Sequence, residues 1–430
     1  MFPYGVSAPI RPLRWLYLDL NSYFASVEQQ EQPRLRGLPI AVAPVESPSG
    51  TIIAASYEAK AYGVRTGHKV REARALCPDL ILTPARHQLY VEYHERVVAE
   101  VWRHIPVTAV CSIDEVACRL LDNENAPQIA AALGRRIKAA IRANIGDQLR
   151  ASIGIAPNRL IAKMACDMEK PDGLVVILGH ELPDRLAPFP LRDIPGVGAK
   201  TAARFAARGL HTIGDLTALG ATRAATALGS VVGSRLWWRL HGADFPDAPA
   251  QSKSVGHSHV LSPHARDPES ARLVARRLLM KAASRLRRGG WATTRLVLGA
   301  RLENGADWRR ELKLAPTADS FALLDGLARL WPLLAEHLAA TGARVRTIGV
   351  TAAEVRPEIG DQGSLFAALP SNDALGRAAR TPKLSAAMDE VNARWGRNAV
   401  TLGPLSGGRA DRVGAKIAFG RIPDAAEFNE

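Results

Sequence analysis

The sequence is poor in cysteine and contains no long apolar run. Its four cysteines (Cys77, Cys111, Cys118 and Cys166) form no CxxC pair and no cluster with histidine. A disulfide framework and a structural zinc site are therefore not expected, which is typical of a reduced, cytoplasmic protein. The longest apolar stretches, such as 174–178, are far too short to cross a bilayer, so no membrane partner is expected. The N-terminus also lacks the apolar core of a signal peptide.

Acidic residues are fewer than basic ones. The chain carries 56 Lys and Arg against 42 Asp and Glu, a formal net charge of +14 at pH 7. This excess favours a polyanionic partner, because the planar guanidinium group of arginine suits phosphate well. An arginine-rich composition with nothing bound is the alternative that charge leaves open. At 430 residues the chain is too long for one core, and roughly three domains are expected.

Residues 14–178 alternate short apolar strands with helices, which predicts an α/β region with an inserted lobe. Strands are expected at Trp15–Leu20, 50–55, on both sides of a turn at 112–115, at 151–156 and at 174–178. Helices are expected from an Asn21 or Ser22 cap through Glu28, after 56, around Ile129, Leu133, Ile137 and Ile141 as one buried stripe, and from 158 to 169.

The second half changes character twice. Residues 179–242 are helical, and the stretch 241–254 is rich in Pro, Ala and Ser, as linkers are. Residues 255–357 repeat a strand–helix–strand pattern, with helices near 269–288 and 317–339. An irregular tail with one short helix near 384–394 follows.

Three acidic residues stand where strands end. Asp19 closes an apolar strand, and Asp114 and Glu115 occupy the turn between two strands. Strand ends can bring acids from distant positions together, and Mg²⁺ takes carboxylates plus substrate phosphates. Two such ions stabilise the attacking and leaving oxygens of an in-line displacement. A solvent-exposed turn is the commoner explanation of an isolated Asp-Glu pair. The flanking sequence is therefore needed to distinguish a metal-binding role from such a turn.

Five blocks of sequence surround and follow these acids: LDLNSYFASVE (18–28), SYEAKAYGVRTG (56–67), CSIDEVACRL (111–120), ASIGIAPNRLIAKMACDMEKPDG (151–173) and DIPGVGAKTAARFAARGL (193–210). They occur in the order found in Y-family translesion DNA polymerases, which the chain resembles over about residues 14–400. A sixth stretch, KSVGHSHVL (253–261), is similar to the start of the little-finger domain of that family.

The resemblance implies an α+β multidomain fold shaped as a right hand, with palm, fingers, a helical thumb containing a helix–hairpin–helix, and a little finger. The implied division is an N-terminal extension (1–13), palm (14–22 and 89–178), fingers (23–88), thumb (179–242), linker (243–254), little finger (255–357) and a C-terminal tail with a clamp-binding motif (358–430).

The resemblance also implies roles for single residues. Asp19, Asp114 and Glu115, with the carbonyl group of Leu20, would hold two Mg²⁺ ions. Phe24, beside Tyr23, would be the steric gate, a ring that collides with the 2′-OH of a ribonucleotide; an aromatic pair in a core is the alternative. The residues that would hold the incoming triphosphate are Tyr57, Lys60 and Lys170. Asn21 and Lys60 resemble the UmuC-type branch more than the DinB-type branch.

Two segments are expected to contact DNA. The turn Gly196-Val197-Gly198-Ala199-Lys200 resembles a helix–hairpin–helix, whose glycines let the backbone approach a phosphate; it lacks P-loop spacing. A simple turn between helices is the alternative. Residues 261–313 carry thirteen Arg or Lys against five Asp or Glu. Arg276 and Arg277 on the helix 269–288 are expected on or near its outer faces, gripping the duplex backbone without reading sequence.

The tail contains Gln362-Gly363-Ser364-Leu365-Phe366, which resembles the peptide that docks on the bacterial sliding clamp. Gln362, Leu365 and Phe366 would be its anchors. UmuC-type members also work with a processed UmuD-type partner and a recombinase filament.

The resemblance therefore implies a DNA-template-directed DNA polymerase that transfers dNMP to a primer 3′-OH, in low-fidelity translesion synthesis during DNA damage repair and the SOS response. Two alternatives remain. The first is an inactive family member that links the clamp to other mutagenesis proteins, although such proteins typically lose the acids. The second is a helix–hairpin–helix nuclease that uses the same metals.

Overall fold

The computed structural model describes residues 12–246, 253–357, 372–396 and 399–403. The chain divides into two compact units, and the boundary in the sequence falls between Asp247 and Ala248. Within the described ranges, no helix is both long and apolar enough to span a membrane.

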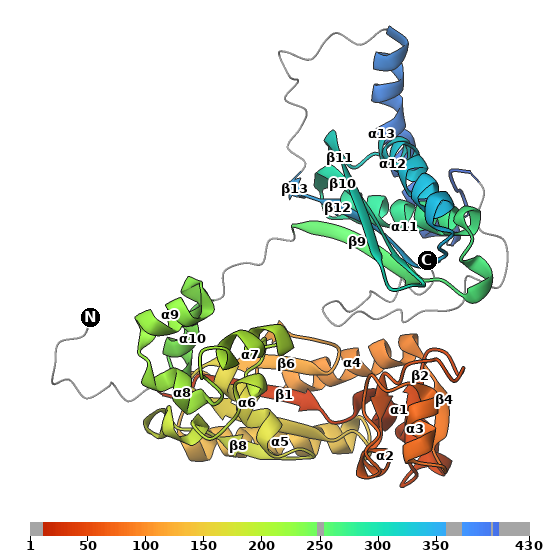
Figure 1. The fold of residues 1–430 in the computed structure, drawn as a ribbon. Coiled ribbons are helices and arrows are strands. Elements are labelled where there is room, and N and C mark those ends of the chain that lie inside the picture. Colours follow the sequence, from red (N-terminus) through yellow and green to blue (C-terminus); the bar gives the residue numbers. More distant parts are fainter. Residues whose placement is uncertain (1–11, 247–252, 358–371, 397–398, 404–430) are drawn as a thin grey trace. The chain divides into compact units, whose positions relative to one another are not determined.

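A five-stranded sheet that includes β1, β6 and β8 forms the centre of the first unit (Figure 1). Its strand order is β5-β6-β1-β7-β8. Strand β1 is antiparallel to both of its neighbours, β6 and β7. Strands β7 and β8 are parallel, so a crossover helix, α6, joins them. The strands are β1 (Trp15–Leu20), β5 (Val107–Val110), β6 (Glu115–Arg119), β7 (Ala151–Ala156) and β8 (Leu174–Val176).

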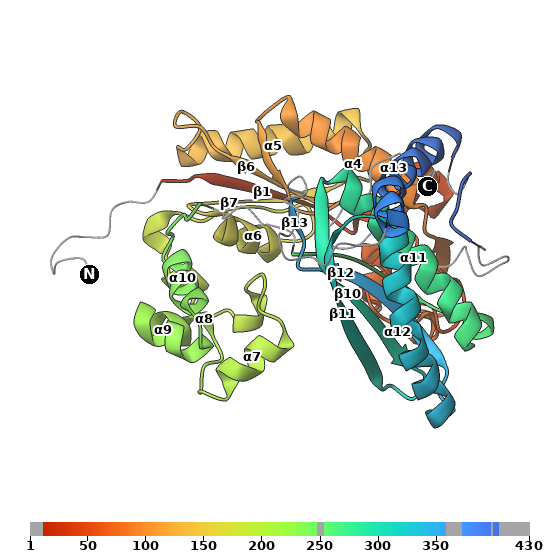
Figure 2. The same ribbon diagram turned by 90° about the horizontal axis from the view of Figure 1, so that it is seen from above.

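Helices cover both faces of this sheet. α6 (Arg159–Met168) lies on one face, and α4 (His87–Trp102) and α5 (Pro127–Asn144) lie on the other (Figure 2). α6 lies so close to β7 that a Cβ atom on Gly154 would come within 2.0 Å of the carbonyl oxygen of Ala162. Trp15 and Tyr17 of β1 share a core with α6. Because strand side chains alternate with a period of two, Asp19 faces the same side.

A smaller three-stranded sheet of order β3-β2-β4 lies between β1 and α4 in the sequence. Its core consists of small and branched apolar side chains such as Ile52, Val64 and Val70. Its elements are α1 (Tyr23–Glu31), η1 (Pro33–Leu35), β2 (Ile40–Ala43), β3 (Ala54–Ala55), α2 (Tyr57–Ala61), α3 (Val70–Leu76) and β4 (Ile81–Pro84).

Short helices complete the first unit and share an apolar core with α6. Asn158 links them to the sheet: its Oδ1 caps α6 by accepting from Ile161 N at 2.9 Å, and its Nδ2 donates to the carbonyl oxygens of Arg239 and Ala243 at 2.7 and 3.0 Å. The helices are η2 (Gly179–Glu181), η3 (Asp184–Leu186), η4 (Leu191–Asp193), α7 (Ala199–Ala206), α8 (Ile213–Ala218), α9 (Ala221–Leu228) and α10 (Val231–Leu240).

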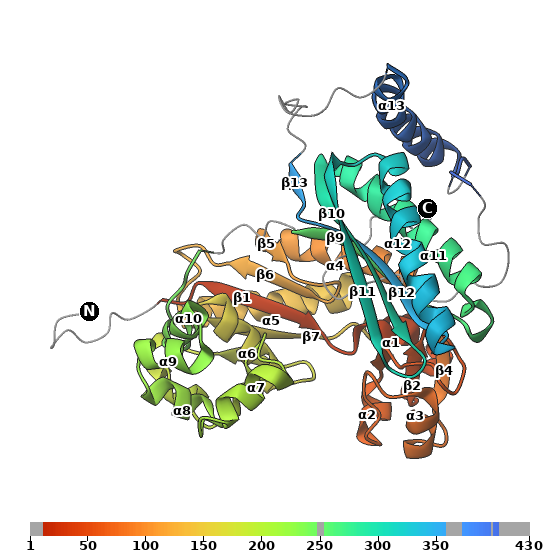
Figure 3. The same ribbon diagram turned by 45° about the horizontal axis from the view of Figure 1, so that its top comes forward.

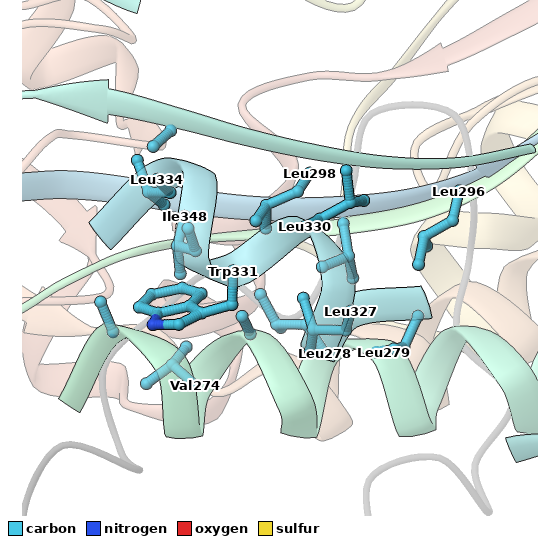
Figure 4. Packing of buried hydrophobic residues seen from close by; sticks show 14 of the residues in the cluster. Val274, Leu278, Leu279, Leu296, Leu298, Leu327, Leu330, Trp331, Leu334 and Ile348 are labelled. Carbon is cyan, nitrogen blue, oxygen red and sulfur yellow. The ribbon is translucent and has the colours of Figure 1, made fainter. Parts of the chain in front are cut away.

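The second unit is a sheet of order β11-β10-β12-β9 with helices α11 and α12 on one face (Figure 3). Leu278, Leu296, Leu330 and Trp331 interdigitate between the helices and the sheet (Figure 4). The elements are β9 (Ser254–Val260), η5 (Pro263–Ala265), α11 (Pro268–Arg288), β10 (Trp291–Leu302), β11 (Asp307–Thr317), α12 (Ser320–Thr341), β12 (Val345–Ala353) and β13 (Arg356–Pro357).

A further helix, α13 (Asn372–Trp395), packs against α12. Ser385 is fully buried there; its hydroxyl accepts from Ser320 N and donates to Asp319 Oδ1 at 2.8 Å. Arg287 of α11 forms a bidentate ion pair with Asp389, with Nε and Nη2 at 2.7 and 2.9 Å from its oxygens. α13 is thus fixed to the core of the second unit.

Most of the predicted strands and helices are confirmed, but four details are wrong. Ile129 is 50% exposed, and Ala130 takes its place in the buried stripe. Ser22 precedes α1 in a left-handed conformation (φ 49°) without capping it through its side chain, and Asn21 bonds elsewhere. Only Ala54–Ala55 of the expected strand 50–55 is a strand. The tail helix begins well before 384.

Candidate active site

The ends of β1 and β6 place two carboxylates side by side. Asp19 pairs directly with Glu115 in the antiparallel register, and Leu20 N donates to the carbonyl oxygen of Asp114 at 2.8 Å. Like charges directly opposite each other destabilise a sheet. Both side chains are nevertheless held there, with Asp19 only 6% exposed. The site therefore needs a cation.

Lys163 of α6 supplies that positive charge. Its Nζ lies 2.6 Å from a carboxylate oxygen of Asp19 and 2.6 Å from one of Glu115. Burial alone would lower the pKa of Lys163, but the two carboxylates outweigh it and raise the pKa above its ordinary value. Burial alone would raise the pKa of Glu115, but the Lys163 ammonium outweighs burial and lowers the pKa of Glu115. Lys163 and Glu115 are therefore both ionised at neutral pH.

Asp114 is in a different electrostatic state. Desolvation raises the pKa of its carboxyl, repulsion from Asp19 and Glu115 adds to this, and a hydrogen bond from Ser112 Oγ opposes it. Among the described residues, no Lys or Arg forms an ion pair with Asp114, in contrast to Asp19 and Glu115. An added cation beside Asp114 would relieve this repulsion.

The three acids offer only oxygen atoms, which suits a hard divalent ion. Within the part of the chain that the structure describes, no three Asp, Glu, His or Cys side chains form a ready-made metal cluster. The donor chemistry fits, and substrate phosphates and water would have to complete the ligand set. The carbonyl group of Leu20 follows Asp19 at the same strand end.

Two further lysines, Lys60 and Lys170, which the sequence predicted at this site, border the acids. Lys170 Nζ lies 2.7 Å from Asp19 and 2.8 Å from Asp167. Lys60 Nζ donates to Ser22 Oγ at 2.7 Å and lies 4.3 Å from the centre of the Tyr57 ring. Burial, with repulsion from Lys170, lowers the pKa of Lys60. The structure therefore brings Tyr57, Lys60 and Lys170 together near Asp19, as a polyanion-binding set requires.

Phe24 lies on the first turn of α1, directly after the end of β1. Its ring is half-buried and stacks on Tyr90 of α4, with centroids 4.3 Å apart and planes at 16°. Tyr23 is buried, and its hydroxyl donates to the carbonyl oxygen of Tyr90 at 2.5 Å. Phe24 thus keeps a free face, whereas Tyr23 is a core residue.

Two residues at this site were not predicted to act in it. Lys163 lies within the matched block 151–173, but only the packing of α6 on the sheet brings it to the acids. Asn21 is 1% exposed; its side chain bonds Ser152 Oγ at 3.0 Å and accepts from Asp172 N at 2.7 Å. It therefore fixes the loop that carries Lys170.

The predicted phosphate-binding turn precedes α7. Gly196 has φ 89°, a left-handed conformation that favours glycine, and Gly198 is the residue before the helix. Gly196, Gly198 and Lys200 are exposed. Backbone N–H groups at the start of α7 are thus accessible to an anion.

The expectation for the α11 arginines needs correction. Arg276 and Arg277 are half-buried rather than on an outer face. Arg276 Nη2 donates to the carbonyl oxygen of Leu402 at 2.8 Å, because the C-terminal segment lies against this side of the helix. Arg272, on the same helix, is exposed. Gln362, Leu365 and Phe366 lie outside the described residues.

Comparison with known proteins places the chain in a family. Residues 18–167 match the impB/mucB/samB family, 181–210 match the helix–hairpin–helix (HHH) motif of the IMS family, and 252–365 match the impB/mucB/samB C-terminal domain. DNA polymerase IV of Moorella thermoacetica is 35% identical over 396 residues, which cover 90% of this chain and 94% of that protein. DNA polymerase IV of Bacillus velezensis is 33% identical, covering 90% and 92%.

Solved structures agree on the fold. A Y-family DNA polymerase chimera of Dbh and Dpo4 superposes with a TM-score of 0.68 at 24% identity, covering 80% of this chain and 99% of that one. An insertion ternary complex of Dbh DNA polymerase gives 0.53 with the same identity and coverage.

The chain therefore belongs to the impB/mucB/samB family, the Y family of DNA polymerases. The predicted fold class and the predicted DNA-directed DNA polymerase are confirmed at this level. The predicted nearness to the UmuC-type branch is not confirmed, since these relatives carry the name DNA polymerase IV.

Proposed function

We propose that this chain extends a DNA primer on a DNA template by low-fidelity, translesion synthesis, with Asp19, Asp114 and Glu115 as the catalytic residues. One observation carries the proposal: Asp19 and Glu115, 96 positions apart, pair across two strands and share one ammonium group, with Asp114 beside them. Crowding acids in this way lowers the stability of the fold, so it indicates that these acids have a chemical role.

The three acids and the Leu20 carbonyl group would hold two Mg²⁺ ions. When bound, the ions would lower the barrier for attack of a primer 3′-OH on the α-phosphate of a dNTP and stabilise the pyrophosphate that leaves. Lys60 and Lys170 offset the remaining triphosphate charge, and Tyr57 orients Lys60. Phe24, with Tyr23 beside it, would exclude ribonucleotides.

We further propose the functional division of the fold. The five-stranded sheet with α4–α6 is the palm (14–22 and 89–178), and the three-stranded sheet is the fingers (23–88). The helices within 179–242 are the thumb, residues 243–254 the linker, and the four-stranded sheet with α11 and α12 the little finger (255–357). Gly196, Gly198 and Lys200 would bind backbone phosphate, and basic residues of the little finger, Arg277 among them, would contribute to the grip, whereas Arg276 bonds the carbonyl oxygen of Leu402.

Low fidelity follows from the short fingers segment, which would check base-pair shape poorly and tolerate damaged templates. A role in the damage and SOS response would then involve the sliding clamp, docked through Gln362, Leu365 and Phe366, and possible UmuD-type and recombinase partners. The proposal that the chain is closer to the UmuC-type branch of the family rests on Asn21 and Lys60 alone. Comparing misincorporation with that of a replicative enzyme on a gapped template tests the fidelity; equal error rates would contradict it.

Primer extension separates this function from its two alternatives. The wild-type chain should lengthen a labelled primer with Mg²⁺ and dNTPs, on undamaged and lesion templates, and Asp114→Ala should not. A scaffold without activity would give no extension in either. A nuclease would shorten a strand when Mg²⁺ is present without dNTPs, whereas a polymerase leaves the strand intact.

A further inference from the structure

Glu28 is a fully buried carboxylate that none of the roles above uses. It is 0% exposed and lies one helical turn after Phe24 on the same face of α1. Arg86 holds it from the start of α4: Nε lies 3.1 Å from both carboxylate oxygens and Nη2 lies 2.6 Å from Oε2. Gln32 Nε2 donates to the same oxygen at 2.9 Å.

The other hydrogen bond of Glu28 connects it to Phe24 through Tyr90. The hydroxyl of Tyr90 donates to Glu28 Oε1 at 2.7 Å, and the Tyr90 ring, itself 0% exposed, stacks against Phe24 at 4.3 Å. Tyr90 is therefore held at its hydroxyl by the carboxylate, while its ring backs Phe24.

The energetics of burial make this arrangement stiff. A buried carboxylate is tolerated only while its hydrogen bonds and counter-charge are in place, so any shift of the Tyr90 hydroxyl is penalised. A ring in close-packed surroundings cannot move without displacing its neighbours. Phe24 therefore has no space to retreat towards α4 when a group pushes on its free face.

We propose that Glu28 and Tyr90 are positioning residues for sugar selection: the carboxylate holds the Tyr90 ring, and the ring keeps Phe24 from yielding to a ribose 2′-OH. The proposal deepens the proposed function and rests on it, because it takes Phe24 as the steric gate. Discrimination by a steric clash requires a rigid wall, since a displacement of about 1 Å is enough to change rates a hundredfold.

The chain offers a matched control on the same two helices. Tyr93 also donates its hydroxyl to a glutamate of α1, Glu31, at 2.6 Å, but the α4 ring that stacks on Phe24 is that of Tyr90. Tyr90→Phe and Tyr93→Phe each remove one hydroxyl–carboxylate bond and keep the ring. Only the first removes the bond behind Phe24.

The test is kcat/KM for a dNTP and for its matching rNTP, opposite the same template base. In Tyr90→Phe the preference for dNTP should fall about tenfold, the value of a hydrogen bond to a charged group, chiefly through a lower KM for the rNTP. Tyr93→Phe should keep the wild-type preference. In a Phe24→Ala background, Tyr90→Phe should change the preference no further. Glu28→Gln, which keeps the shape, should resemble Tyr90→Phe.

Three results would overturn the inference: wild-type preference in Tyr90→Phe, an equal loss in Tyr93→Phe, or an additional loss from Tyr90→Phe after Phe24→Ala. The Tyr90→Phe result decides even where Glu28→Gln does not fold. The arms also separate this inference from the proposed function. If the wild type incorporates dNTPs and Tyr90→Phe discriminates normally, the inference alone is wrong; if the wild type incorporates no dNTP, both are wrong.

Discussion

The two units of the molecule differ in how their charged side chains are distributed. In the first unit, acids at the ends of β1 and β6 are crowded together, and Lys163 lies 2.6 Å from both Asp19 and Glu115. In the second unit, an apolar core separates the sheet from its helices, and arginine surrounds it. Some of these arginines, such as Arg287, bond the protein itself, and others, such as Arg309, are exposed. The acids at the ends of β1 and β6 thus share an ammonium group at one site, whereas the arginines of the second unit either bond the protein itself or are exposed to a polyanion.

The largest expected effect is on the chemical step. Asp19→Asn removes one negative charge at the strand end and should lower kcat by about a thousandfold, as loss of a group that stabilises the transition state does. Binding of primer-template DNA, measured by fluorescence anisotropy without dNTP, should stay within a factor of two. If DNA affinity falls as far as kcat, the assignment of Asp19 to the chemical step rather than to DNA binding is wrong.

The second largest effect is expected on stability, when the ammonium group of Lys163 that Asp19 and Glu115 share is removed. Lys163→Met leaves two carboxylates facing each other, and loss of one partner from a buried pair costs about 3 kcal/mol. Thermal unfolding without Mg²⁺ should show this loss, and millimolar Mg²⁺ should restore more stability to the variant than to wild type, because an ion that binds the folded state stabilises it. A loss that Mg²⁺ does not reduce would count against a metal site at these acids.

A structural arginine of the second unit should behave differently. Arg287 bonds Asp389, Ser320 Oγ and the carbonyl oxygen of Ala318. Arg287→Ala should cost about 2 kcal/mol of unfolding free energy, as lost hydrogen bonds to a charged group do. The salt dependence of DNA affinity should not change. A reduced salt slope with normal stability would instead assign Arg287 to DNA.

The smallest expected effect comes from an exposed arginine. Arg309 lies on β11 opposite Gly299, and its side chain is exposed. Arg309→Ala should weaken DNA binding a few-fold and lower the slope of log affinity against log salt by about one, as loss of one phosphate contact does. Its melting temperature should match wild type. An unchanged slope would show that this face does not grip DNA.

The strands that carry the acids were readable from the sequence, because short apolar runs end at Asp19 and at the turn before Glu115. Contacts across the fold were not. Lys163 reaches the acids only because Gly154 lets α6 lie against β7. Asn21 was expected near a helix start and instead holds the Lys170 loop. Helical periodicity identified the polar side of α11 but could not show that the chain after α13 covers Arg276.

The most direct test of the central claim is to count divalent ions at the acids, independently of activity. Bound Mn²⁺ can be titrated by electron paramagnetic resonance on the chain with primer-template DNA and a non-hydrolysable dNTP. We expect two tightly bound ions in the wild type and at least one fewer in both Asp19→Asn and Asp114→Ala. Equal numbers in all three proteins would contradict the assignment of these acids as metal ligands.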